Sequence, residues 1–157
     1  MSIFQFEPTD IAEWRKLLLE GQDKAGFQLT EVVENYLVIT LNAHVTHTQL
    51  ASAVMAVDLL KNIHIKSVTN AHALRSVGDQ CLILAGLFPE RAKRKNVSAE
   101  YFRNLGENAY YVLSFANTFP KYDHSLFYQL FENFSDLIRI LKSMRLGSTA
   151  FTTTLFN

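Results

Sequence analysis

The polar residues best suited to chemistry are His72, Arg75 and Asp79, which lie in one short stretch of the chain. Their spacing places all three side chains on one face of a helix. A carboxylate near a guanidinium and an imidazole can bind an anion or act in general acid–base chemistry. The structural alternative is that Asp79 pairs with Arg75 along the helix and closes a gap between helices. The sequence leaves both interpretations open and offers no evident nucleophile.

The helix that carries these residues is expected to start after a cap at Thr69 and to end before Pro89, because proline disfavours the helical conformation in the residue before it. Beyond Asp79 the sequence is apolar on every side, so the helix should begin half-exposed and end buried. Gly86 lies in the buried part, where glycine costs about 0.8–1 kcal/mol relative to alanine. We expect Gly86 to admit a neighbouring helix, which we place at residues 123–145.

A basic segment follows, with its charges on Arg91, Lys93, Arg94 and Lys95. These side chains could contact a phosphate group or an acidic partner. The alternative is a solvated loop between two helices, which the balanced charge of the chain favours.

Three tyrosines lie on the next predicted helix, at residues 99–117: Tyr101, Tyr110 and Tyr111. Tyrosine joins a flat apolar ring to a polar tip, so the group could line a ligand pocket or a protein interface. Packing at the edge of the core explains them equally well. We group Tyr110 with His72, Arg75 and Asp79 as a candidate ligand contact.

Recognised catalytic and cofactor motifs are missing from the sequence. It contains no HExxH, no Glu-x-x-His pair, no GxSxG elbow, no GxxxxGK[ST] loop and no GxGxxG fingerprint. Cys81 lies on the apolar stripe of its predicted helix and is interpreted as a small buried hydrophobe. We therefore predict no cofactor, no metal and no catalytic residue, although metal ligands brought together only in space stay possible.

Composition is typical of one folded domain. The 157 residues are 48% apolar and 19% charged, with twelve phenylalanines and little proline or glycine. Lys+Arg and Asp+Glu both count 15, and this zero net charge argues against general nucleic-acid binding. A single cysteine suits a reducing cytoplasm. No secretory signal and no membrane-spanning apolar run are evident.

Apolar residues at helical spacing predict an all-α fold of about six helices packed as a single bundle. The first helix is expected to bury Ile11 and Trp14 and to end near Gly21, and the second to start at a Thr30 cap and to bury Tyr36 and Ile39. Residues 36–40 could also form a strand, but their flanks favour helix. The remaining patterns cover residues 50–60, 70–88, 99–117 and 123–145. We predict one domain over 1–146 and a loosely ordered tail over 147–157.

The middle of the chain resembles a family of uncharacterised bacterial proteins. The resemblance rests on Gly78-Asp79-Gln80-Cys81-Leu82, Ala85-Gly86-Leu87-Phe88-Pro89-Glu90, Asn96-Val97-Ser98, Tyr101-Phe102, Leu105-Gly106 and Ala109-Tyr110. It implies a bacterial source and a helical fold. The family has no established activity, so the resemblance implies no catalytic residue.

These observations favour a non-enzymatic helical protein-interaction or regulatory module of the bacterial cytoplasm, which would associate with itself or with another protein. The alternative is a small-molecule-binding protein or an enzyme whose polar site surrounds His72, Arg75 and Asp79. The sequence does not decide whether the chain is an enzyme.

Overall fold

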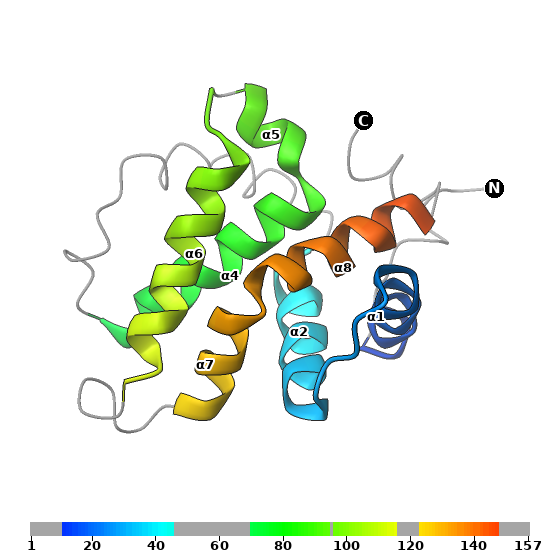
Figure 1. The fold of residues 1–157 in the computed structure, drawn as a ribbon, viewed down its shortest axis with the longest axis horizontal. Coiled ribbons are helices and arrows are strands. Elements are labelled where there is room, and N and C mark those ends of the chain that lie inside the picture. Colours follow the sequence, from blue (N-terminus) through cyan, green and yellow to red (C-terminus); the bar gives the residue numbers. More distant parts are fainter. Residues whose placement is uncertain (1–10, 46–69, 95, 116–122, 148–157) are drawn as a thin grey trace.

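The computed structural model describes residues 11–45, 70–94, 96–115 and 123–147. Seven helices and no strand occupy these residues, which confirms the all-α prediction and the helical assignment of residues 36–40 (Figure 1). The helices are α1 Ile11–Ala25, α2 Glu31–His44, α4 Ala71–Leu87, α5 Pro89–Arg94, α6 Ala99–Leu113, α7 His124–Glu132 and α8 Phe134–Gly147. The helix predicted at residues 50–60 and residues 148–157 of the predicted tail lie outside the described residues, whereas Gly147, which was assigned to the tail, is the last residue of α8.

Most helix starts follow from local capping chemistry. The Thr30 hydroxyl accepts a hydrogen bond from the Val33 N–H, and the Ser98 hydroxyl accepts one from the Tyr101 N–H. The predicted cap at Thr69 is wrong by one residue, because the Asn70 side chain accepts from the Ala73 N–H at 3.1 Å. The predicted extension to residue 117 is also wrong, since α6 ends at Leu113.

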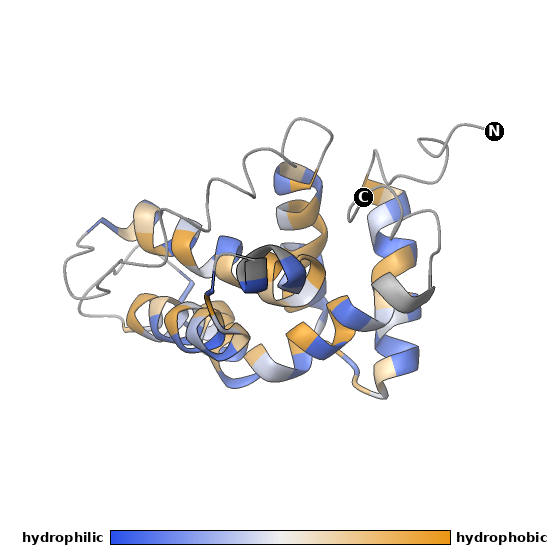
Figure 2. Cartoon of the chain, turned by 90° about the horizontal axis from the view of Figure 1, so that it is seen from above, coloured by the Kyte–Doolittle hydropathy of each residue, from blue (hydrophilic) through white to orange (hydrophobic). Residues whose placement is uncertain are grey.

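Helix α4 lies at the centre of the fold, with α6 and α8 packed against it (Figure 1). His72, near its start, is exposed, whereas every residue from Cys81 to Phe88 is buried. This confirms the expected change from a half-exposed to a fully surrounded helix. Figure 2 shows hydrophobic and hydrophilic residues interleaved along the helices, as expected where each helix has one buried side. None of the described helices has the length and apolar character needed to cross a membrane.

The predicted helix over residues 123–145 is interrupted at Asn133, where it divides into α7 and α8. Helix α7 packs on α6 and α2, whereas α8 packs on α1 and α4. The break therefore lets one segment cover two sides of the bundle. A continuous apolar pattern hides such a break, because both halves keep helical spacing.

Two glycines mark helix crossings. A Cβ atom on Gly86 would lie 2.6 Å from the Leu141 Cβ atom of α8, which confirms the expected close approach. Gly21 was expected near the end of the first helix, but α1 continues to Ala25. A Cβ atom there would lie 2.8 Å from the Ile140 carbonyl oxygen, so Gly21 serves a second crossing with α8.

Two isoleucines assigned to buried stripes are exposed. Ile39 is 55% exposed and Ile11 is 45% exposed. On α2, Val33, Tyr36, Leu37, Val38, Thr40 and Leu41 are buried around Ile39. The apolar pattern there is too wide to show which residue of the set faces outward.

Candidate functional site

The buried polar centre of the protein is the carboxylate of Asp79, which is 3% exposed in the middle of α4. Its Oδ1 atom accepts two short hydrogen bonds, from the Tyr36 hydroxyl of α2 at 2.5 Å and from the Tyr110 hydroxyl of α6 at 2.6 Å. One carboxylate oxygen therefore joins three helices. We call Asp79, Tyr36, Tyr110 and Arg75 the Asp79 centre.

Arg75 reaches the centre from one helical turn before Asp79. Its Nε atom donates to the Tyr36 hydroxyl at 3.1 Å and lies 3.8 Å from Asp79 Oδ2. The guanidinium carbon also lies 5.1 Å from the centroid of the Tyr36 ring, within the range of a cation–π contact. Because the side chain is 39% exposed, Arg75 forms the edge of the centre that solvent reaches.

Burial dominates the electrostatics of the centre. Loss of hydration raises the pKa of the Asp79 carboxyl above its usual value of 3.8, and the hydrogen bonds from Tyr110 and Tyr36 and the charges of Arg75 and His44 oppose this rise. Burial, together with the Asp79 charge, also raises the pKa of both phenols. The two hydroxyls therefore remain protonated and act as donors to the carboxylate.

Aromatic rings enclose the hydroxyl groups. Tyr36 packs edge-on against Phe127 at a centroid distance of 5.8 Å, and Tyr110 lies 5.9 Å from Phe127 and 5.8 Å from Phe134. A Cβ atom on Gly78 would lie 2.5 Å from the Tyr110 ring, so only glycine lets that ring approach α4. This close aromatic packing encloses the Asp79 carboxylate, and its Oδ1 atom is hydrogen-bonded to the two tyrosine hydroxyls.

The predicted constellation of His72, Arg75, Asp79 and Tyr110 is brought together only in part. Arg75, Asp79 and Tyr110 meet, whereas His72 is exposed two helical turns from Asp79. The histidine whose charge acts on Asp79 is His44, at the end of α2. Sequence reasoning missed Tyr36, which had been assigned to an apolar stripe. A polar tip on that stripe was the available signal, because a buried tyrosine hydroxyl requires a partner.

The three tyrosines of α6 separate in space. Tyr110 is fully buried at the Asp79 centre, and Tyr101 packs against Phe102 at a centroid distance of 5.6 Å. Tyr111 instead lies on the surface, 4.7 Å from Phe115 and 4.7 Å from Phe131, and Phe131 is 5.9 Å from Tyr128. We call Tyr111, Phe115, Tyr128 and Phe131 the aromatic surface.

The basic segment is not the loop that the sequence suggested, because residues 89–94 form the short helix α5. Pro89 suits its first position, where the missing N–H would have no helical partner. Lys93 is exposed. The side chains of Arg91 and Arg94, and all of Lys95, lie outside the described part, so their predicted role as anion or partner contacts stays a prediction.

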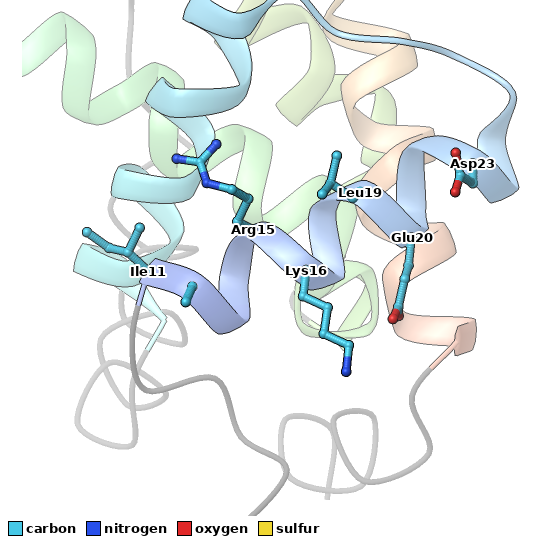
Figure 3. Close-up of a pocket in the computed structure, with 7 residues that line it drawn as sticks. Ile11, Arg15, Lys16, Leu19, Glu20 and Asp23 are labelled. Atoms are coloured by element: carbon cyan, nitrogen blue, oxygen red, sulfur yellow. The ribbon is translucent and has the colours of Figure 1, made fainter.

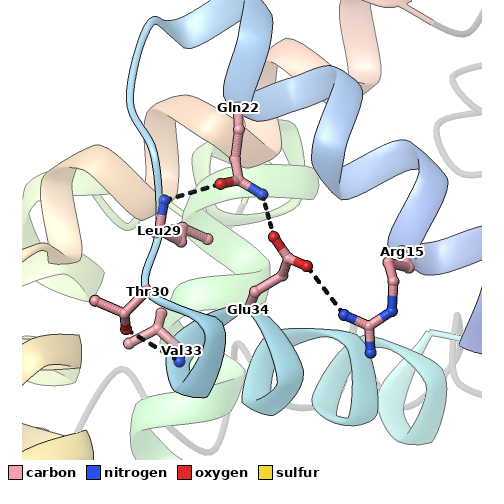
Figure 4. A network of polar contacts seen from close by, with 6 residues as sticks. All are labelled: Arg15, Gln22, Leu29, Thr30, Val33 and Glu34. Carbon is pink, nitrogen blue, oxygen red and sulfur yellow. Dashed lines mark hydrogen bonds and ion pairs between the residues drawn. The ribbon is translucent and has the colours of Figure 1, made fainter.

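A second polar network joins α1 to α2 (Figure 4). The Glu34 carboxylate accepts from Arg15 Nη1 at 3.0 Å and from Gln22 Nε2 at 2.9 Å. The Gln22 side-chain oxygen in turn accepts from the Leu29 N–H at 2.8 Å, which secures the turn between the two helices.

Reactive groups for metal or thiol chemistry are not gathered in the described residues. They contain no cluster of three or more His, Cys, Asp or Glu side chains able to hold a metal ion. Cys81 is buried, and burial raises the pKa of its thiol, which disfavours the nucleophilic thiolate.

Comparison with known proteins gives no relative: no family model, no curated protein and no solved structure matches the chain.

Proposed function

We propose that the protein is a non-enzymatic helical module that acts through protein–protein contact, with a second copy of itself or with another protein. The observation that carries this proposal is the aromatic surface. Its placement in a bacterial cytoplasm rests on the family resemblance and on the single cysteine.

The aromatic surface exposes rings that would ordinarily be buried. Tyr111 is 39% exposed, Phe115 39% and Tyr128 46%, and the rings pack on one another across α6 and α7. Aromatic side chains offer a large, rigid contact area, and they are enriched at the centres of protein interfaces. Their mutual packing lowers the entropy lost when a partner binds.

The Asp79 centre supports the same proposal because its carboxylate is closed off from solvent. Its carboxylate is buried and bonded to two phenols, which suits a structural joint between α2, α4 and α6. A catalytic acid or base must reach the proton that it transfers. Asp79 lacks that access, whereas the aromatic rings are open to a partner.

Site-specific photo-crosslinking tests the proposal. A photoreactive phenylalanine analogue replaces Tyr128 in cells of the source organism, and the matched control places it at Lys142, which is exposed on α8. We expect a discrete adduct from position 128 and none from position 142, with mass spectrometry showing whether the adduct is a second copy or another protein. Equal labelling at both positions, or none at either, would contradict the proposal.

A second candidate function is the binding of a small organic anion at Arg75. The observation that favours it is the difference in exposure between the two partners. The Arg75 side chain is 39% exposed and can be reached by an anion, whereas the Asp79 side chain beside it is only 4% exposed. A thermal-shift screen of small carboxylates and phosphate esters tests it. Stabilisation of the natural protein that disappears in Arg75→Gln would support this function, and a screen without any stabilising compound would count against it.

A further inference from the structure

The outward side of α1 forms an open concavity of about 700 Å³ (Figure 3). The described residues that line it all belong to this helix, and they form two neighbouring rows in which successive residues are one turn apart: Ile11, Arg15, Leu19 and Asp23 in the first row, and Ala12, Lys16 and Glu20 in the second. We call these seven residues the α1 face. The other side of the helix is buried against α8 and α2 through Trp14 and Leu18.

The α1 face is apolar at its N-terminal end and near its middle. Leu19 is 47% exposed and Ile11 is 45% exposed, and the stems of the long charged side chains extend this apolar area. Paired helices make contact through apolar residues that are flanked by charged side chains, and the α1 face shows this combination.

The order of charges along the α1 face is the informative feature. The N-terminal half carries Arg15 and Lys16, and the C-terminal half carries Glu20 and Asp23. At its two ends α1 follows the helix macrodipole, with Glu13 in the first turn and Lys24 in the last turn, so the order of charges on the α1 face is a separate feature. A lysine four residues before a glutamate is the less favourable orientation for a helical ion pair. Ion pairing along α1 therefore does not explain this order of charges.

We propose that the α1 face pairs with the α1 face of a second copy, with the two helices antiparallel about a two-fold axis near Leu19. This inference rests on the proposed function and names self-association as one of its contacts. The basic and acidic pairs lie on opposite sides of Leu19, each about 4.5 Å along the helix from their common midpoint. An antiparallel copy therefore places each basic pair opposite an acidic pair, and the two Leu19 side chains meet at the axis.

A parallel pairing would oppose like charges, so charge selects the antiparallel arrangement. Within the described residues Lys16, Glu20 and Asp23 form no ion pair, and they remain available for contacts across the axis. Arg15 already binds Glu34 at 3.0 Å, so Lys16 supplies the main positive charge for the second copy.

Reciprocal charge reversal tests the pairing by sedimentation equilibrium. Lys16→Glu removes the net positive charge from the N-terminal half of the α1 face and sets a carboxylate against the acidic half of the second copy, and the double variant Glu20→Lys, Asp23→Lys makes both halves basic. For each variant alone, the dissociation constant of the dimer should rise about tenfold relative to the natural chain. The two-fold symmetry makes each repulsive contact occur two times in the dimer. An equimolar mixture of the two should form a heterodimer close to the natural affinity. Lys142→Glu on α8 is the matched control and should leave the affinity unchanged.

Three outcomes would overturn the pairing: a natural chain that is monomeric at all concentrations, a Lys16→Glu effect no larger than that of Lys142→Glu, or a mixture that fails to restore association. A monomer that still crosslinks from position 128 would refute the α1 pairing alone and leave the proposed function standing. Circular dichroism of each variant verifies that a loss of association does not arise from unfolding.

Discussion

Two arginine–carboxylate contacts in this protein differ in which group satisfies the carboxylate. Glu34, with a side chain 16% exposed, is bonded by the Arg15 guanidinium at 3.0 Å and by an amide. Asp79, with a side chain 4% exposed, keeps its arginine at 3.8 Å and is bonded instead by two phenols at 2.5 and 2.6 Å. At the more buried site, neutral donors have taken the place of direct contact with the cation.

The difference follows from the cost of removing charges from water. Burying a close ion pair requires desolvation of both ions, whereas phenol donors need much less. Arg75 can therefore stay at the surface while Asp79 lies in the core. We expect the Asp79 centre to contribute strongly to stability and the Glu34 network to contribute little, and the following experiments test that contrast.

The largest effect is expected for Asp79→Ala, which leaves the Tyr36 and Tyr110 hydroxyls without their acceptor. Each buried polar group left unsatisfied costs about 1–3 kcal/mol, so the free energy of unfolding should fall by several kcal/mol. Urea denaturation measures the change. Glu107→Ala removes a carboxylate from the partly exposed side of α6 and is the matched control. Equal midpoints for the two variants would show that Asp79 is no structural joint.

Gly78→Ala should disturb the same centre by steric contact. The added methyl group would lie 2.5 Å from the Tyr110 ring and push its hydroxyl away from Asp79. Overpacking costs about 1–3 kcal/mol, and a gain of about 0.8–1 kcal/mol in helix propensity opposes it. We expect a net loss of stability in thermal unfolding. In a Tyr110→Leu background the same substitution should be harmless, and an unchanged penalty there would place the clash elsewhere.

Gly86→Ala examines the apolar crossing with α8, where no hydrogen bond is involved. The added Cβ atom would lie 2.6 Å from the Leu141 Cβ atom, which cannot move without its helix. The balance of overpacking against helix propensity again predicts a net destabilisation of up to about 2 kcal/mol, and Gly86→Val should be worse. A higher melting temperature for Gly86→Ala would refute the close packing.

The pH dependence of stability shows whether burial, which raises the pKa of Asp79, outweighs the hydrogen bonds and charges that lower it. The pKa of Asp79 is raised in the folded protein, so folding favours the protonated carboxyl. The stability of the natural protein relative to Asp79→Asn should therefore fall as the pH rises from the unfolded pKa near 3.8 to the folded pKa. Chemical denaturation between about pH 4 and 8 measures this difference. A rise over that window would show that the phenols and Arg75 outweigh burial.

The smallest effect is expected for Arg15→Ala, which removes one donor from Glu34. With side chains 38% and 16% exposed, this ion pair should contribute about 0–1 kcal/mol, and added salt should reduce that contribution. Urea denaturation at low and high salt measures the change. A loss as large as that of Asp79→Ala would remove the contrast between the two contacts.

Local chemistry determined much of the fold from the sequence. Apolar spacing located the helices, and Thr30 and Ser98 capped them because a side-chain oxygen satisfies an N–H only a few residues away. The apolar run after Asp79 identified the buried half of α4, and Gly86 identified its crossing with the 123–145 segment. Each of these inferences depends on neighbours within one or two helical turns.

Tertiary structure decided the Asp79 centre. Tyr36 lies 43 residues before Asp79 and Tyr110 lies 31 residues after it, and no local pattern links such distant positions. Tertiary structure also decided the helix break at Asn133 and the exposure of the Ile39 side chain. Each depends on which neighbouring helices pack against that segment. Sequence spacing determines which side chains share a face of one helix. Only the packing of helices against one another determines which partner that face meets and how much water remains between them.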